Sequence, residues 1–536
     1  MFNHMNLLDL SIIFLWLISM SNEYLQYAYF WQLKEYRWDR FLDLLRTNEG
    51  KRILFRYDFF YKIPLILVVF FWDQHSVIIK LVVLLIYVLD FLYIIAKVVL
   101  KRPIKKPKFS LKIILILFIA IFVEAAFFEE TKDIRTIATF SFLRFMSITI
   151  IVNLMNIASQ FVKDYIARMA TKKMANCTKM RVIGITGSYG KTTTKEILSK
   201  LLSHKFKVIK TPKNINTDIG ISKFILKTSF KDVDYFVVEM GAYRIGEINK
   251  ICNIVKPEIG ILTAISPQHL SLFGSIENIQ TAKYELLRSL PKNGLAITNS
   301  DNKYCREFLG ELKCKVMTFG VEEKFNPNCM IEDMKETDTG ILCKFIRNID
   351  NEKIEVELQT RLFGDYNISN LQPSLLTATH LGFIIDEIKE ALKNVESPGN
   401  ALRVQKYGEA LLLNDSYNSN PDGFRAAINA LSRYSHSYKK VIITRGIIEL
   451  GELSDEIHEQ IGGEIAFVAD ELVIIAPDFA EPLKKGVGTK YQTKVMVKLD
   501  SNEILAYLQS LKNEKAVILL ENRLPQIVRE EIEKNT

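Results

Sequence analysis

Cysteine is scarce in this sequence: the 536 residues hold six cysteines, and no two of them form a C-x-x-C pair. A zinc site or a disulfide framework needs several cysteines at short, regular spacings. The sparse pattern therefore excludes both, and it favours reduced thiols that face the cytosol. Internal repeats and low-complexity tracts are also missing, which excludes a repeat architecture. The length instead predicts several domains with sizeable cores.

Acidic residues are fewer than basic ones, and the formal net charge is +9. Such an excess could suit a nucleic-acid-binding protein, but the basic residues concentrate beside apolar segments. Membrane topology explains this arrangement better. We therefore expect a membrane lipid bilayer as a partner and no nucleic acid.

The first 160 residues are predicted to form a membrane domain. Apolar segments run roughly over 6–21, 59–72, 76–99, 111–128 and 137–157. About 20 apolar residues cross a bilayer as a helix, so the pattern predicts an α-helical transmembrane bundle of about five helices. The first segment is interpreted as an uncleaved anchor, because no Lys or Arg precedes it.

Basic clusters determine the predicted orientation of this domain. They lie in residues 31–56 and 101–108 and in a basic linker at 161–180, whereas the intervening turns are acidic or neutral. Five crossings with the N-terminus outside place all three clusters inside, as the positive-inside rule requires. We therefore expect a multi-pass protein of the cell (inner) membrane whose remaining domains are cytoplasmic.

Two features of the first 160 residues leave alternatives open. Tyr29 to Leu45 carries aromatic and leucine residues at helical spacing, and this stretch either lies along the cytosolic interface or packs on its own bundle. Glu124 stands inside an apolar segment and is either functional or close to the membrane surface. A position near the surface is the preferred interpretation.

A glycine-rich loop at residues 184–194 is predicted to bind the phosphates of ATP. It follows an apolar β-like run and precedes a helix-like run from Lys195, so backbone N–H groups and the positive helix end would point at one spot. Lys191 would reach the β- and γ-phosphates, and the Thr192 hydroxyl would bind Mg²⁺. The alternative is a tight turn with a solvated Lys191. The other loop residues assigned to nucleotide binding are Gly187, Ser188, Tyr189, Gly190 and Thr193.

Strand-like and helix-like runs alternate after this loop, which predicts βαβ units and a largely parallel sheet. We expect an ATP-binding α/β domain over 181–398 and a smaller Rossmann-like α/β domain over 399–536. Polar clusters follow the strands, where ligands of such sheets bind. Glu239 ends one strand and would be a Mg²⁺ carboxylate or a helix N-cap acid. His269 follows another strand and, taken alone, would more often be structural.

Several motifs in register make the sequence from about 181 to 536 resemble the Mur ligase family, and most closely its members that add D-alanyl-D-alanine. In chain order, the matching stretches are 184–194, 211–220, Glu239 to Ala242, His269 to Glu285, Leu362 to Asn370, Asn414 to Asp422, and Glu449 to Gly451. The resemblance implies a ligase that uses ATP to phosphorylate a carboxylate and lets an amine attack the acyl phosphate.

The resemblance also implies roles for individual residues. Lys191 would stabilise the transferring phosphoryl group, Thr192 and Glu239 would hold one Mg²⁺, and His269 would hold a second. Lys283 matches the lysine that family members carbamylate into a further metal ligand; a bare lysine on an exposed helix is the alternative. The implied nucleotide-binding residues further along the chain are Asn367, Arg403, Asp415, Tyr417 and Asn418. The implied substrate-binding residues are Asn214, Asn216, Thr217 and Asn420.

Three functions stay open at this point. The first is an ATP-dependent, ADP-forming ligase of peptidoglycan precursor synthesis that joins D-alanyl-D-alanine or a similar amine to a cell-wall precursor carboxylate. The second is the same ligation on a lipid-linked or other envelope carboxylate at the inner leaflet, because a membrane bundle replaces the family's usual UDP-substrate domain. The third is a non-catalytic membrane scaffold with a nucleotide-binding fold.

Overall fold

The structure of the protein is a computed structural model that divides into two compact units, Met1–Asp164 and Tyr165–Thr536. It describes residues 7–46, 50, 77–100, 106–213, 215–337, 340–349, 352–362, 366–395, 403–416, 420–488 and 492–535.

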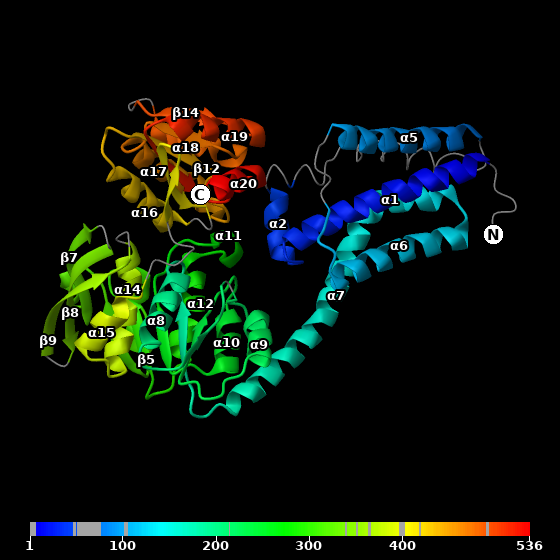
Figure 1. Ribbon diagram of the computed structural model, residues 1–536. Helices are drawn as coiled ribbons and strands as arrows, with labels where there is room; N and C mark the ends of the chain where they lie inside the picture. Colours follow the sequence, from blue (N-terminus) through cyan, green and yellow to red (C-terminus); the bar gives the residue numbers. More distant parts are fainter. Residues whose placement is uncertain are drawn as a thin grey trace. The chain divides into compact units, whose positions relative to one another are not determined.

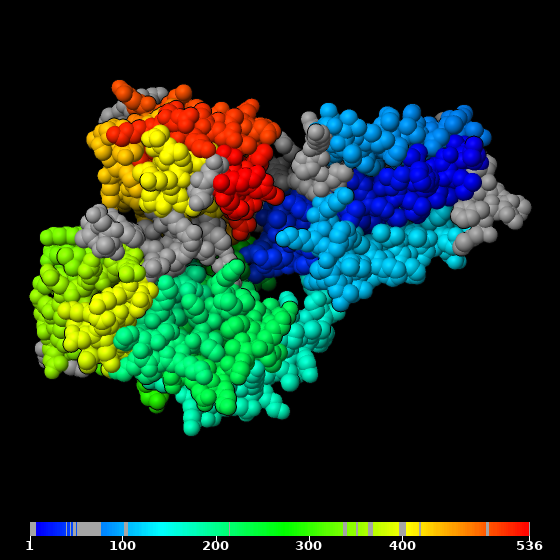
Figure 2. Space-filling view, in the orientation of Figure 1, coloured from blue at the N-terminus to red at the C-terminus, as the bar shows by residue number. Residues whose placement is uncertain are grey.

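Every described secondary-structure element of the first unit is a helix (Figure 1). Its helices are α1 (Leu7–Leu33), α2 (Trp38–Arg46), α5 (Val77–Val99), α6 (Leu111–Thr131) and α7 (Ile134–Ala175), the last of which continues into the second unit. Among the described residues, α1, α5, α6 and α7 are long and apolar enough to cross a membrane. The predicted segment 59–72 lies outside the described residues. The space-filling view shows α1 and α5, in two blue shades, packed side by side (Figure 2).

A buried ion pair joins three helices of the first unit. The Arg144 guanidinium on α7 donates to both oxygens of Glu124 on α6 at 2.8–3.2 Å. Trp16 and Tyr24 on α1 also donate to this carboxylate, at 2.9 and 2.8 Å, and Glu23 lies 3.5 Å from Arg144. All five side chains are buried. Glu124 therefore takes part in helix packing, and its expected position near the membrane surface stays a prediction.

The stretch from Tyr29 to Leu45 packs on its own unit. Trp31 at the end of α1 stacks on Phe41 of α2, with ring centroids 4.1 Å apart. Phe41 and Leu44 are buried in the same core. The structure therefore supports the packing alternative for this stretch.

The second unit contains a nine-stranded sheet in the order β2-β3-β1-β4-β5-β6-β7-β8-β9. Strands β1 to β6 pair in parallel, whereas β7, β8 and β9 pair antiparallel. The strands are β1 (Arg181–Thr186), β2 (Val208–Lys210), β3 (Tyr235–Glu239), β4 (Ile259–Leu262), β5 (Leu295–Asn299), β6 (Lys315–Phe319), β7 (Cys329–Thr337), β8 (Gly340–Ile349) and β9 (Glu352–Thr360). The predicted parallel α/β arrangement is confirmed, and the antiparallel extension β7–β9 is an addition that the sequence analysis missed.

Helices cover both faces of this sheet. They are α8 (Lys191–Leu202), α9 (Asp218–Lys227), α10 (Glu247–Val255), α11 (Leu270–Phe273), α12 (Ile276–Arg288), α13 (Lys303–Arg306), α14 (Tyr366–His380) and α15 (Ile385–Leu392). One apolar core holds residues of α8, α14 and α15, and the other holds residues of α9, α10 and α12. Predicted site residues stand at or just after the carboxyl ends of β1, β3 and β4, at one edge of the sheet.

A second sheet has six strands in the order β10-β11-β15-β12-β13-β14, and only β10 and β11 pair antiparallel. The strands are β10 (Arg403–Tyr407), β11 (Ala410–Asp415), β12 (Lys439–Thr444), β13 (Glu471–Ile474), β14 (Lys494–Val497) and β15 (Ala516–Glu521). The helices are α16 (Pro421–Ser432), α17 (Ser454–Ala466), α18 (Ala480–Val487), α19 (Ser501–Ser510) and α20 (Gln526–Asn535). Separate cores on the two faces make this the smaller α/β layer structure that the sequence predicts.

The end of α7 belongs to the second unit. Ala170 and Met174 are buried in the core beside α9. The Lys173 ammonium donates to the carbonyls of Leu226 and Thr228 at 3.1 and 2.7 Å, where α9 ends. Cations are favourable at a helix C-terminus. Most of the basic stretch 161–180 is therefore helix, and its last turns pack on the α/β fold.

Replacing Arg144 with methionine should destabilise the first unit strongly. Glu124 and Glu23 would remain buried without their cation, and breaking a buried pair in this way costs about 3–5 kcal/mol. The measurement is thermal unfolding of the full chain in detergent, followed by helical circular dichroism. Arg135→Ala is the control, because Arg135 pairs with Asp133 at a partly exposed site, and pairs near the surface are worth only about 0–1 kcal/mol. Equal unfolding temperatures for both variants would contradict the prediction.

Candidate active site

The glycine-rich loop connects β1 directly to α8. The helix begins at Lys191, four residues earlier than the predicted helix-like run. Gly187 and Gly190 have φ of +151° and +79°, in the left-handed range that favours glycine. A Cβ at these positions would lie 2.0 Å from Thr263 Oγ1 and 2.2 Å from Asn370 Oδ1. Only glycine therefore lets the loop pack between the end of β4 and α14.

Hydrogen bonds to the segment after β4 hold the loop in place. The Ser188 N–H donates to the Ala264 carbonyl at 2.8 Å, and the Ser188 hydroxyl donates to the Ser266 carbonyl at 3.1 Å. The Thr263 hydroxyl donates to the carbonyls of Thr186 and Tyr189. The loop is thus a prearranged cradle rather than a loose turn, as phosphate binding requires.

The Lys191 ammonium lies against its own loop. It donates to the carbonyls of Gly187 and Ser188 at 2.6 and 3.0 Å. Burial lowers the pKa of Lys191, and the Glu239 carboxylate partly opposes this shift. Lys191 is therefore held at the mouth of the cradle, where an anionic phosphate would be a better partner than two neutral carbonyls.

Glu239 at the end of β3 connects three segments of the site. Its carboxylate accepts from Thr192 Oγ1 at 2.8 Å, Lys195 Nζ at 3.1 Å and Asn216 Nδ2 at 3.1 Å. The tertiary structure therefore brings together Thr192, Asn216 and Glu239, all three predicted from sequence. Lys195 was missed; the available signal was its position one helical turn after Lys191, on the same face of α8. Its ammonium also donates to the Lys213 carbonyl at 2.8 Å.

His269, Lys283 and Lys191 influence one another electrostatically. The ring of His269 binds the Glu449 carboxylate through Nδ1. Burial lowers the pKa of His269, the bond to Glu449 opposes this, and the charges of Lys283 and Lys191 lower it further. Burial, and then the charge of Lys191, lowers the pKa of Lys283 to about 7. Lys283 is 3% exposed, so the bare exposed lysine considered from sequence is not what the structure contains.

Glu449 comes from the loop after β12, which belongs to the second sheet. Its contact with His269, which follows a strand of the first sheet, could not be predicted from the sequence. The Glu449 backbone carbonyl also accepts from the Ser271 N–H at 3.1 Å. The neighbouring Gly446 carbonyl accepts from the buried Asn522 side chain, and the Ile447 N–H donates to His458 Nε2 at 2.9 Å. These bonds position the loop that presents Glu449 to His269.

Of the other predicted residues, some cap helices or end a strand, and the rest have side chains or positions outside the described part of the chain. Thr217 caps α9 by accepting from the Gly220 N–H, and Asn420 caps α16 by accepting from the Gly423 N–H. Burial raises the pKa of Asp415, at the end of β11, to about 7. Asn367 lies in α14 and Arg403 in β10, and their side chains are outside the description. Asn214, Tyr417 and Asn418 lie outside the described residues.

The side chains suited to a metal are limited in the described ranges. No group of three or more His, Cys, Asp or Glu side chains gathers there around a common point. The oxygen atoms beside the loop that could bind a metal ion belong to the Thr192 hydroxyl and the Glu239 carboxylate, which lie 2.8 Å apart. Magnesium prefers such oxygens and keeps much of its coordination for water and substrate phosphates, so this pair fits the predicted ion.

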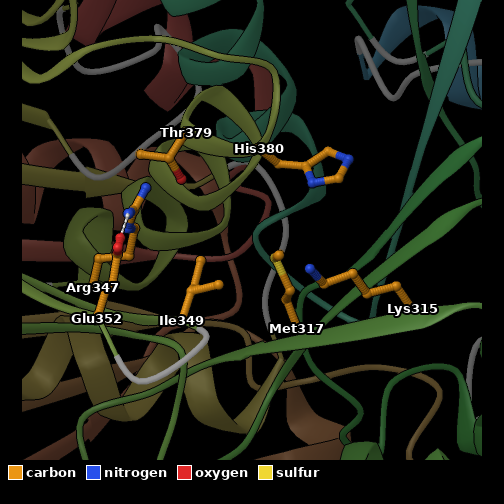
Figure 3. Close-up of a pocket in the computed structure, with 7 residues that line it drawn as sticks. All are labelled: Lys315, Met317, Arg347, Ile349, Glu352, Thr379 and His380. Carbon is orange, nitrogen blue, oxygen red and sulfur yellow. Dashed lines mark ion pairs between the residues drawn. The ribbon is translucent and has the colours of Figure 1, made fainter.

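A separate hollow of about 330 Å³ lies away from this site (Figure 3). Lys315 stands at the start of β6 and His380 at the end of α14, while Arg347 and Glu352 face each other across 3.9 Å. The start of a parallel strand is the edge opposite to its carboxyl end. The hollow is therefore not part of the phosphate cradle.

Comparison with known proteins identifies similarity over most of the second unit. The Mur ligase middle domain matches residues 185–378, and the domain described as "Mur ligase, glutamate ligase domain" matches residues 402–521. The UDP-N-acetylmuramoyl-tripeptide–D-alanyl-D-alanine ligase of Escherichia coli (strain K12) is 30% identical over 320 residues, which are 59% of this chain and 69% of that protein.

Solved structures are similar as well. MurF from Thermotoga maritima, in complex with ADP, has a TM-score of 0.59 at 28% identity and covers 70% of this chain and 84% of its own. MurF from Acinetobacter baumannii has a TM-score of 0.60 at 25% identity and covers 69% of this chain and 79% of its own.

Lys283 should react with acetic anhydride, a small electrophile that does not itself titrate, with a half-maximal rate near pH 7. Its pKa is lowered to about 7, and only the neutral amine is nucleophilic, so the rate should rise as the pH passes 7 and then level off. A free lysine peptide in the same sample, with a pKa of about 10.4, provides the control. Peptide mass spectrometry measures both adducts; parallel pH profiles would contradict the lowered pKa.

Proposed function

The chain belongs to the Mur ligase family, and from this premise we propose that it is an ATP-dependent, ADP-forming ligase of peptidoglycan precursor synthesis. The γ-phosphoryl group of ATP passes to an acceptor carboxylate, giving an acyl phosphate and ADP. The amine of D-alanyl-D-alanine or a similar compound then attacks the acyl carbon, and phosphate leaves as the amide forms. The observation that carries the proposal is that the Glu239 carboxylate accepts hydrogen bonds from Thr192 and Asn216 beside the glycine-rich loop.

In the proposed reaction, the protein contributes mainly by stabilising charge and by positioning the reactants. Phosphate and carboxylate are both anions, so cations must bring them together, and such transfers depend on positioning and charge stabilisation. Lys191 would exchange its two loop carbonyls for phosphate oxygens. Lys195 would neutralise Glu239 and keep its carboxylate aimed at Thr192. Asn367, Arg403, Asp415, Tyr417 and Asn418 remain proposed for the nucleotide.

Thr192 and Glu239 are proposed to hold one Mg²⁺, and His269 with a carbamylated Lys283 a second. Bound there, the ions would neutralise phosphate charge in the transition state. A pKa of about 7 supports carbamylation of Lys283, because an amine must be neutral to add to CO₂. The Glu449 carboxylate that binds His269 would orient the imidazole, as carboxylates commonly do for metal-binding histidines.

The first unit is proposed to cross the cell membrane, with the second unit in the cytoplasm. Support comes from the four long apolar helices and from α5, where Leu81, Leu85, Leu89 and Leu92 form an exposed face. Such a face is costly in water and favourable in lipid. A membrane location favours a second candidate, in which the acceptor carboxylate belongs to a lipid-linked precursor rather than to a UDP-linked one.

Lys191→Ala should lower ATP-dependent ADP release by about 10²-fold or more, since it removes the cation that contacts the transferring phosphoryl group. The assay uses the full chain in detergent with D-alanyl-D-alanine and, in separate reactions, UDP-linked and lipid-linked acceptors. Lys200→Ala is the control, because Lys200 is an exposed residue of the same helix.

Turnover with only the UDP-linked acceptor would eliminate the lipid-linked candidate. ADP release that is absent in the wild type, or equal in wild type and Lys191→Ala, would contradict a ligase and support the non-catalytic scaffold.

A further inference from the structure

Helix α7 carries an exposed stripe that changes character along its length. Leu154, Ile157 and Phe161 are 60%, 61% and 74% exposed, and Tyr165 is 64% exposed. Arg168 and Lys172, both exposed, continue the stripe. The spacings of three, four, four, three and four residues keep all six side chains on one face of a helix.

The order along this stripe matches the profile of a membrane boundary. Aliphatic residues belong in the hydrocarbon, aromatic residues gather at the interface, and basic residues lie among the headgroups on the cytoplasmic side. Arg168 and Lys172 form no ion pair with any residue in the described ranges. Asp164 is the nearby acid, and it accepts from Gln160 at 2.8 Å within the same helix.

In the last turns of α7, around Arg168 and Lys172, the opposite face is already occupied. Ala170 and Met174 are buried in the core of the second unit, and Lys173 caps the end of α9. The basic end of the stripe is therefore attached to the α/β fold without an intervening flexible segment. Around Arg168 and Lys172, the face that remains open to a partner is the one that continues the line of Phe161 and Tyr165.

Helix α9 lies between the end of α7 and the predicted phosphate site. Its N-terminal side begins next to Asn216, which donates to Glu239, and its C-terminal end accepts from Lys173. Ten helical residues span about 15 Å. The Glu239 carboxylate therefore lies about one short helix away from the end of α7.

We infer that the exposed stripe of α7 docks on the anionic surface of the inner leaflet, with Phe161 and Tyr165 at the hydrocarbon boundary and Arg168 and Lys172 on lipid phosphates. This inference rests on the proposed membrane location of the first unit. The occupant is a phospholipid surface, because the exposed charges are basic and follow directly on an apolar and aromatic face. The ligase would then work next to the leaflet, where a lipid-linked acceptor resides.

The test uses the full chain in nanodiscs of phosphatidylcholine alone or of equal parts phosphatidylcholine and phosphatidylglycerol. A benzoylphenylalanine photoprobe replaces Tyr165, and mass spectrometry identifies its adducts. The expected result is a phospholipid adduct whose yield increases about fivefold or more with phosphatidylglycerol, given two basic residues near an anionic surface. The increase should be lost in Arg168→Glu/Lys172→Glu. It should persist in the matched control Lys200→Glu/Lys250→Glu, which reverses two exposed lysines of α8 and α10.

A second photoprobe, at Phe118, tests the membrane location of the first unit separately from the docking of α7. Phe118 is 63% exposed on α6 and should give a phospholipid adduct in either nanodisc. No lipid adduct at Phe118 would overturn the membrane location and the docking with it. Two results would overturn the docking alone, provided that Phe118 gives a lipid adduct. One is a protein adduct at Tyr165, and the other is a lipid adduct at Tyr165 whose yield does not depend on phosphatidylglycerol.

Discussion

The contact between the Glu239 carboxylate and its three donors organises the candidate site. Thr192 and Lys195 belong to α8, and Asn216 belongs to the segment that leads into α9, so one carboxylate joins a helix and a loop to the end of β3. A buried carboxylate is tolerated only when cations and hydrogen bonds compensate it. The arrangement thereby keeps a hydroxyl, an ammonium and an amide converging on the Glu239 carboxylate, beside the glycine-rich loop.

Compensation of buried charge also shapes the first unit. Arg144 on α7 neutralises Glu124 on α6, while α1 supplies the additional donors Trp16 and Tyr24. The same helix α7 then ends in the core of the second unit. The buried ion pair therefore holds α7 in the first unit, whereas apolar packing and the hydrogen bonds of Lys173 hold its end in the second unit.

Sequence reasoning succeeded where a pattern is local. The glycine-rich loop, the alternation of strands and helices, and Glu239 at a strand end all follow from residue order and from the rule that ligands bind at the carboxyl ends of parallel strands. It failed for β7–β9, because antiparallel hairpins at a sheet edge give weaker signals than βαβ units. It also missed the role of Glu449, whose partner His269 is far away in sequence, and it missed Lys195, although that residue lies one helical turn after Lys191.

The sequence by itself determined the α/β class, the phosphate cradle and the apolar character of the first unit, because composition, periodicity and glycine placement are written in neighbouring residues. Only the tertiary structure decided which charges are buried and what they contact. Glu124 meets Arg144 20 residues away, and His269 meets Glu449 180 residues away. Such pairs carry no local signal, because the free energy of a buried charge depends on the environment that the whole fold creates around it.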